Sequence, residues 1–312
     1  MKKQYLLASI AALFFCAASV NAQNIQPKLE GTSTPNVFQV PTLQTRAETQ
    51  TARPDSAVVE EYGDVVSKEV YKYDDAGRKT EQVDYENTPL VPKFKHLYEY
   101  DENGKLSKIN TTYWNGTQWI LFCVENYAYD GQGRQTRYDY DRIAIEGVFE
   151  KRHVVYLTKY EGNKVITALE DTTWHKEPNV HYETHKNTLI QILDDRGNII
   201  SEEYFDNIYG YAPLKQEMTY DENNRMLKKF SVYYNADGSV DVKYRDTFTY
   251  GGQYEYQLME ISEGGEDNWQ FALGTGLKII EGNPKIIVCY DRANGEDTPM
   301  TEWKSTSYYY PN

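Results

Sequence analysis

The sequence lacks the features that mark most helical proteins and most enzymes. No long stretch has the 3.6-residue apolar periodicity of an amphipathic helix. The Gly-x-Ser-x-Gly motif, a phosphate-binding loop and a Cys/His dyad are also absent from the sequence. We therefore expect an all-β chain with no catalytic activity and no cofactor. A secreted glycan hydrolase is the alternative, because two carboxylates about 5–10 Å apart suffice geometrically and the chain has 47 acidic residues.

Cysteine and positive charge are both scarce. The chain has three cysteines, and the two outside the N-terminal segment, Cys123 and Cys289, do not make a disulfide framework. In an open sheet these two would lie too far apart to form a bridge, so we expect two free thiols. The 33 basic residues are outnumbered by acidic ones, which gives a formal net charge of −14. This charge argues against nucleic acid and against anionic membranes as partners.

The one long apolar run lies at the N-terminus. Residues 1–22 combine a basic start, an apolar core and a small-x-small sequence that ends at Ala22. This is the pattern of a secretory signal peptide, and the run is short for a transmembrane helix. Phe15 precedes Cys16 where a lipoprotein signal has a small residue, so we favour cleavage near Ala22 over lipid anchoring. The protein is expected to be exported to the periplasm, the outer surface or the medium, with no insertion into a membrane.

The next segment contains little that forms a core. Residues 23–57 are rich in Thr, Pro and Gln without a clear period, which is typical of a flexible linker. Residues 58–312 would then form a single domain. Two tripeptides, at Ser56 and Thr172, resemble the acceptor sites of Bacteroidetes O-glycosylation. Of these two, Ser56 is expected to be the more accessible, because it lies in the linker.

Tyrosine, in contrast, is abundant, with 29 residues, and several belong to a repeated segment. The segment reads Tyr-x-Tyr-Asp-x-x-Gly-Lys/Arg at 71–78, 98–105 and 127–134, and recurs in looser form at 191–198 and 218–225. Asp in the first position and Gly in the fourth are typical of a type I turn followed by a G1 bulge. We interpret each copy as a hairpin turn, called a YD turn below, with an acid paired to a base across its mouth. The turn positions are Asp74, Gly77, Asp101, Gly104, Asp130, Gly133, Asp194, Gly197, Asp221 and Asn224.

The spacing of the copies predicts the architecture. They recur about every 30 residues, which accommodates two strands, one YD turn and one variable loop. We therefore expect an antiparallel meander of about sixteen strands built from repeated hairpins. The strands would form a curved or rolled sheet, and the sequence does not decide whether that sheet closes into a barrel. In this register Tyr98 opposes Lys108, and Tyr127 lies over Arg137. Charge occurs mid-strand on both faces, which disfavours the remaining alternative, an outer-membrane barrel with an uncharged outer band.

Two of the copies carry a family resemblance. The segments YEYDENGKLSKI and YAYDGQGRQTRY resemble the YD repeats of RHS-type proteins, whose pattern is Tyr-x-Tyr-Asp-x-x-Gly-Arg-Leu. The chain also resembles secreted Bacteroidetes proteins built from such hairpins. The resemblance implies β-hairpins and no particular activity.

Tryptophans gather at the loops that lie opposite the YD turns. Trp114 and Trp119 flank the loop at 115–118, and Trp174 and Trp269 border other variable loops. Indole rings at an exposed rim stack on sugars or peptides, although they would equally cover the ends of a thinly packed sheet. We expect a non-catalytic binding or structural module, with a glycan or a surface protein as partner. The candidate ligand-binding residues are Trp114, Asn115, Gln118, Trp119, Trp174 and Trp269.

One segment suggests a metal site. His181, Glu183 and His185 share one face if the segment is a strand, because strand side chains alternate. Neighbours on one face of a strand are about 7 Å apart, however, which is long for ligands of a single ion. A solvated polar strand face is therefore the alternative interpretation.

Overall fold

The computed structural model describes ten segments of the chain: residues 53–87, 89–145, 150–175, 181–206, 214–235, 237–250, 255–263, 267–280, 282–292 and 301–311. The expected signal peptide and most of the expected linker lie outside these segments. Among the described residues, no helix is long and apolar enough to cross a membrane.

The described segments form one 18-stranded sheet, slightly more than the sequence predicts. The strands are β1 (Ser56–Glu61), β2 (Asp64–Tyr73), β3 (Lys79–Glu86), β4 (Val91–Tyr100), β5 (Leu106–Trp114), β6 (Trp119–Tyr129), β7 (Gln135–Arg142), β8 (Lys151–Glu161), β9 (Lys164–His175), β10 (His181–Leu193), β11 (Ile199–Asp206), β12 (Leu214–Tyr220), β13 (Met226–Tyr234), β14 (Val240–Thr249), β15 (Glu255–Glu263), β16 (Gln270–Ile280), β17 (Lys285–Arg292) and β18 (Thr301–Tyr309).

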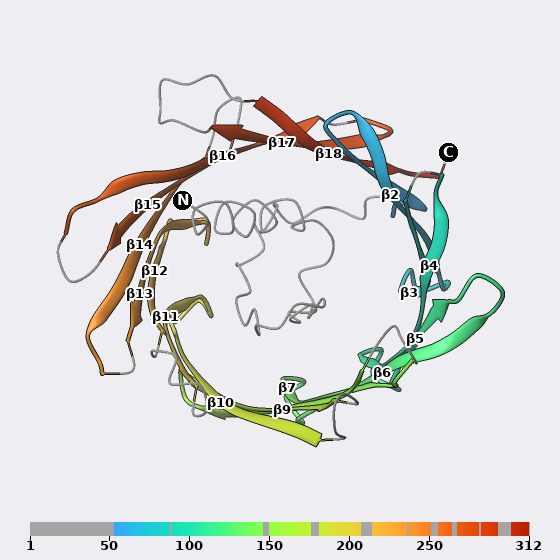
Figure 1. The fold of residues 1–312 in the computed structure, drawn as a ribbon, viewed down its shortest axis with the longest axis horizontal. Helices are drawn as coiled ribbons and strands as arrows, with labels where there is room; N and C mark the ends of the chain where they lie inside the picture. The colour runs from blue at the N-terminus through green and yellow to red at the C-terminus, as the bar shows by residue number, and fades with distance from the viewer. Residues whose placement is uncertain are drawn as a thin grey trace.

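The sheet is an antiparallel meander that closes into a barrel. Each strand pairs with its neighbours along the chain, and β1 pairs with both β2 and β18. Figure 1 shows the resulting ring, in which β16, β17 and β18 lead back to β2. The structure therefore confirms the expected meander and answers the question of closure that the sequence left open.

The strand that closes the barrel comes partly from the expected linker. β1 begins at Ser56, which lies opposite Val70 of β2 and Tyr309 of β18. Just before it, the backbone N–H of Asp55 donates to the carbonyl oxygen of Tyr309 at 2.9 Å. Ordered structure thus begins before residue 58, because this segment pairs the edges that β2 and β18 would otherwise expose.

The two faces of the closed sheet differ in burial. Tyr71, Gln82, His96 and Thr111 are successive cross-strand partners on β2 to β5, and their face of the sheet is buried or half-buried. Side chains converge on the concave side of a barrel, so this face lines the interior. The alternating residues, such as Lys72 with 67% of its side chain exposed, point outward.

Two apolar clusters pack on the interior face. One extends over β5 to β9 and consists of Leu106, Cys123, Tyr127, Tyr138, Tyr140, Val154 and Leu169. The other spans the seam and consists of Ala57, Tyr71, Met218, Met226, Phe248, Leu277, Ile287, Cys289 and Tyr308. Tyrosine rings therefore supply much of the packing that Leu, Ile and Val supply in other proteins.

The two cysteines differ from each other. Cys123 is a free thiol, 2% exposed, and burial raises its pKa to about 12. Cys289 is disulfide-bonded. The expectation of two free thiols is therefore wrong at Cys289.

Beyond each YD turn, the observed cross-strand pairing differs by one residue from the predicted register. Tyr98 lies opposite Ile109, not Lys108, and Tyr127 lies opposite Tyr138, not Arg137. A bulge next to the turn shifts the pairing by one residue, and a shift of one exchanges the two faces of a strand. Lys108 consequently points outward, where its ammonium is 4.0 Å from the carboxylate of Glu99.

Candidate functional site

The YD turns have the backbone geometry of bulged hairpin turns. The N–H of Asp101 donates to the carbonyl oxygen of Lys105 at 2.8 Å, and the N–H of Gly104 donates back to the carbonyl oxygen of Asp101 at 2.9 Å. Gly104 has a φ of 76°, and Asn224, which replaces glycine in its copy, has a φ of 61°. The other glycines at this position also have positive φ values: Gly77, Gly133 and Gly197.

The turn aspartates are fully engaged with their own turns. Oδ1 of Asp101 accepts hydrogen bonds from the backbone N–H groups of Asn103 and Lys105. Hydrogen bonds from the backbone and side chain of Arg78 likewise hold the pKa of Asp74 below its usual range. Three copies contain the expected ion pair at 2.7 Å: Asp74–Arg78, Asp130–Arg134 and Asp221–Arg225. The copy at 98–105 differs, because the ammonium of Lys105 instead donates to the carbonyl oxygen of Gly133 in the next turn.

The tyrosine before each turn connects neighbouring hairpins, a role that the sequence did not reveal. The hydroxyl of Tyr100 donates to the carbonyl oxygen of Lys79 at 2.7 Å, and Tyr129 donates to Leu106 in the same way at 2.9 Å. Each acceptor directly follows the preceding YD turn. The equivalent bonds elsewhere are Tyr160 to Gln135, Tyr220 to Ile199 and Tyr250 to Met226.

The basic residue of one turn also stacks on the tyrosine of the next. The guanidinium carbon of Arg78 is 4.7 Å from the ring centroid of Tyr100, and that of Arg134 is 4.3 Å from the centroid of Tyr160. Such cation–π contacts contribute about 0.5–1 kcal/mol each at exposed sites. The repeated side chains of the YD motif thus join neighbouring hairpins, and few of their polar groups are left available for a ligand.

The opposite end of the barrel, called the loop end below, carries the candidate tryptophans. Trp114 and Trp119 lie directly opposite each other on β5 and β6, with ring centroids 5.3 Å apart. Between them, Oδ1 of Asn115 accepts hydrogen bonds from the backbone N–H groups of Thr117 and Gln118. The side chain of Asn115 is therefore committed to the turn, although both Asn115 and Gln118 are exposed.

Each of three loop-end tryptophans has a cation over its ring. The ammonium of Lys95 is 4.8 Å from the centroid of Trp119. Lys151 lies over Trp174 and Arg245 over Trp269, both at 4.6 Å. These partners could not be predicted from the sequence, because they come from other strands and depend on the register.

The predicted ligand-binding residues do not form a single site. Trp114 and Trp119 are together, but Trp174 lies on β9 and Trp269 precedes β16, far from them in strand order. Alternation along the strands places the rings of Trp114 and Trp174 on the outer face, since their neighbours Tyr113 and Thr173 face inward. The loop end therefore presents several separate aromatic positions: Trp114 packs against Trp119, and Trp269 packs against Phe230 with ring centroids 6.0 Å apart.

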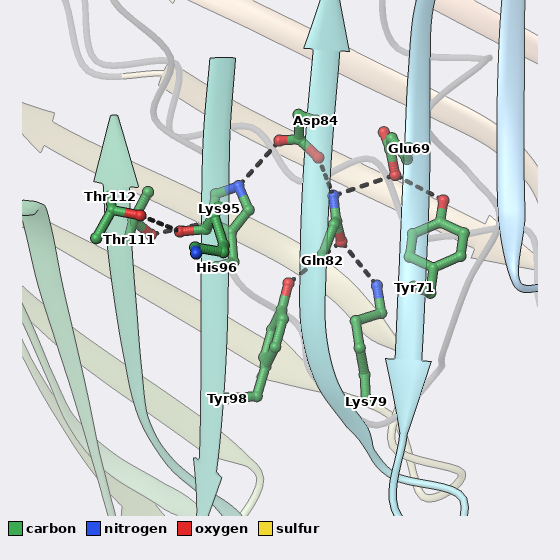
Figure 2. Close-up of polar contacts among 10 residues, drawn as sticks. All are labelled: Glu69, Tyr71, Lys79, Gln82, Asp84, Lys95, His96, Tyr98, Thr111 and Thr112. Carbon is green, nitrogen blue, oxygen red and sulfur yellow. Dashed lines mark hydrogen bonds and ion pairs between the residues drawn. The ribbon is translucent and has the colours of Figure 1, made fainter. Parts of the chain in front are cut away.

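A chain of polar side chains crosses the interior face of β2 to β5 (Figure 2). Nε2 of Gln82 donates to carboxylates on both sides, to Glu69 at 3.1 Å and to Asp84 at 2.7 Å. The imidazole of His96 continues the chain, with Nε2 2.9 Å from Asp84 and Nδ1 2.9 Å from the hydroxyl of Thr111. These buried and half-buried groups satisfy one another, as most buried polar groups in proteins do.

Other interior acids are occupied in a similar way. The carboxylate of Glu125 accepts hydrogen bonds from the hydroxyls of Tyr127 and Tyr138, at 2.5 and 3.0 Å. Asp171 forms a two-point ion pair with Arg152, whose Nε is 2.9 Å from Oδ1, and the two side chains are only 10% and 15% exposed. Burial raises the pKa of Glu202, which accepts a hydrogen bond from Gln191.

The outer face of the barrel carries ion pairs in the middle of its strands. Directly opposite residues pair between β2 and β3, where Lys72 is 2.6 Å from Glu81, and between β11 and β12, where Lys215 is 2.7 Å from Glu203. Comparable outward pairs are Glu170–Lys186 at 3.0 Å and Arg245–Glu260 at 2.7 Å. Charge therefore surrounds the barrel on the outside.

The expected metal ligands are only partly described. The imidazole of His185 is 3.9 Å from the carboxylate of Glu183, and the side chain of His181 lies outside the described part of the structure. In the ranges that the structure describes, no three His, Cys, Asp or Glu side chains are grouped as metal ligands.

The two expected glycosylation sites lie in strands. Ser56 is half-buried at the start of β1, and not in a free linker. Thr172 is 9% exposed, and its hydroxyl is 2.9 Å from that of Thr184. In the folded barrel Ser56 is less accessible than its expected place in a linker implied, and Thr172 is buried.

Comparison with known proteins gives solved structures of low similarity. Neither protein-family models nor curated proteins match the chain. A porin-like protein from Bacteroides vulgatus is 9% identical, with a TM-score of 0.38 over 84% of this chain and 99% of its own. A porin-like protein from Bacteroides uniformis is 10% identical, with a TM-score of 0.30 over 82% and 96%. The Photorhabdus luminescens Tc holotoxin pore is 10% identical, with a TM-score of 0.37 over 75% of this chain, which spans only 13% of the toxin chain. With TM-scores below 0.5, the resemblance to YD-repeat proteins rests on the sequence motif alone.

Proposed function

We propose that the chain is an exported, non-catalytic β-barrel module that binds a glycan at its loop end. The observation that carries this proposal is the difference between the two ends of the barrel. At the YD end, the tyrosine hydroxyls bond to backbone carbonyl groups of the neighbouring hairpin, and the turn aspartates bond to their own turns and to the basic groups. At the loop end, Trp114 and Trp119 form an outward aromatic pair beside the exposed side chain of Gln118. Aromatic rings next to amide groups suit the apolar faces and hydroxyls of a sugar.

The proposal places the outer wall in water. Outward ion pairs such as Lys72–Glu81 and Glu170–Lys186 occur on strands all around the barrel. A lysine or arginine facing lipid at the bilayer midplane costs about 2–4 kcal/mol. A water-filled environment such as the periplasm or the cell exterior avoids this cost.

A glycan array tests the proposal. The wild-type protein should bind one class of glycan, and a Trp114→Ala/Trp119→Ala double variant should keep its melting temperature and lose that binding. Lys108→Ala, at an outward position away from the rim, is the matched control and should bind normally. Unfolding of the double variant would show that the indoles serve packing, and normal binding by a folded double variant would exclude this site.

An outer-membrane barrel is the second candidate, because the eighteen-stranded sheet closes and carries outward tryptophans at one end. It predicts that the protein needs detergent and partitions into outer-membrane vesicles. Recovery of the folded barrel in buffer without detergent would exclude it. A glycan hydrolase is the third candidate, and it is less well supported because interior acids such as Glu125 and Asp171 already have strong partners. Release of reducing sugars from a bound glycan would support it.

A further inference from the structure

Tyr62 has an unusual backbone conformation at the turn between β1 and β2. Its φ is 52° and that of Gly63 is 88°, the left-handed pair of a type I′ hairpin turn. Asn, Asp and Gly are favoured at the first of these positions, whereas a bulky aromatic residue is an outlier there. The side chain of Tyr62 is also 81% exposed. Neither the turn nor packing therefore explains a tyrosine at this position.

A recess of about 390 Å³ lies beside this turn, at the seam where β1 meets β18. It belongs to the loop end of the barrel, because the β1–β2 turn lies at the end opposite the YD turns. The recess is lined by Glu60, Tyr62, Gly63, Glu302, Lys304 and Ser305.

The lining offers both hydrogen-bond acceptors and donors. Glu60 and Glu302 bring carboxylates, and the hydroxyl of Ser305 is 3.4 Å from the Glu60 carboxylate. The ammonium of Lys304 is 3.2 Å from the carboxylate of Glu61. These two residues alternate with Ser305 and Glu60 along β18 and β1, so their ion pair faces the interior, while Glu60 and Ser305 face outward. A sugar hydroxyl donates to a carboxylate and accepts from a hydroxyl, so it matches the outward groups of the lining.

We propose that the seam recess binds a neutral pyranose unit, whose apolar face stacks on Tyr62 and whose hydroxyls bond to Glu60 and Glu302. The choice of a sugar rests on the proposed function, but the site is separate from Trp114 and Trp119, which lie on β5 and β6. The recess adds a second contact point on the same end of the barrel. Two weak sites on one glycan chain bind more tightly than either alone.

Saturation-transfer NMR on the whole protein tests the recess, with hexasaccharides of mannose, glucose and N-acetylglucosamine as probes. Tyr62→Asn is the informative variant, because asparagine suits the type I′ turn and should keep or raise the melting temperature. We expect it to weaken binding of the recognised probe by about tenfold, the loss of one stacking contact. Tyr62→Phe keeps the ring and should bind like the wild type.

The outcomes separate this site from the tryptophan rim. Loss of binding in Tyr62→Asn with binding retained in Trp114→Ala/Trp119→Ala supports the recess and counts against the rim. The reverse result leaves the proposed function intact and overturns the recess. Saturation transfer from none of the probes at millimolar concentration overturns the recess as well.

Discussion

The hydroxyl of Tyr129 donates a hydrogen bond to the carbonyl oxygen of Leu106, 2.9 Å away, and thereby joins two consecutive YD hairpins. The ammonium of Lys105 adds to this junction, because it lies 5.0 Å from the centroid of the Tyr129 ring. Burial raises the pKa of Tyr129, so the hydroxyl remains a donor over the physiological pH range. The same bond recurs at Tyr100, Tyr160, Tyr220 and Tyr250, so this part of the motif joins hairpins as well as forming a turn.

Removing this hydroxyl should weaken the barrel measurably. We expect Tyr129→Phe to lower the free energy of unfolding by about 0.5–1.5 kcal/mol, the net value of one hydrogen bond. Tyr309→Phe is the control, because that ring is 41% exposed on the outer face and its change should have little effect. Urea denaturation of both variants makes the comparison, and equal stability would mean that the bond between hairpins contributes nothing.

The fourth turn position should discriminate between side chains. Gly104 has a φ of 76°, so Gly104→Val should destabilise the protein by about 1–3 kcal/mol through backbone strain. Gly104→Asn should be mild, since Asn224 occupies the same position at a φ of 61°. Chemical denaturation of both variants decides the point, and equal tolerance of Val and Asn would contradict the turn geometry.

Two arginine–aspartate pairs on neighbouring strands should differ in their effect on stability. Arg152 and Asp171 are buried in the interior, so Arg152→Met should cost about 3–5 kcal/mol by leaving a buried carboxylate unpaired. Arg137 and Asp139 pair on the outer face, with Arg137 51% exposed, and Arg137→Met should cost about 0–1 kcal/mol. Thermal and urea unfolding measure both. A double variant, Arg152→Met/Asp171→Leu, should recover much of the loss; if it does not, the packing of Arg152 matters more than its charge.

Glu202 should make stability depend on pH. Burial raises its pKa above the ordinary value of 4.5, so the folded state binds this proton more tightly than the unfolded state does. The carboxyl group therefore does not lower the free energy of unfolding below about pH 4.5. It lowers that free energy increasingly as the pH rises from 4.5 through the folded pKa. Glu202→Gln should match the wild type at low pH and be more stable at neutral pH.

Melting temperatures measured across this pH range test the effect. Glu203→Gln is the control, because Glu203 faces outward and pairs with Lys215, and it should bring no gain at neutral pH. A Glu202→Gln variant that is less stable than the wild type at neutral pH would show that the ionised form is favoured in the barrel.

The local chemistry of this protein can be read from its sequence. Asp101 and Gly104 specify a bulged hairpin turn through their own backbone preferences, and repetition of that turn about every 30 residues specifies an antiparallel meander. These features depend on interactions within a few residues, and for that reason the fold class and the YD turns were predictable.

Tertiary structure alone decided the rest. Closure depends on Ser56 pairing with both Val70 and Tyr309, a contact between the two ends of the domain that no local pattern signals. The bulge at each turn shifts the register by one residue, which turned Lys108 outward and brought Ile109 over Tyr98. The cations over the tryptophans and the recess beside Tyr62 follow from this register and from the seam. Because side chains alternate with a period of two, a single-residue shift settles which of them meet, and only the folded barrel fixes that shift.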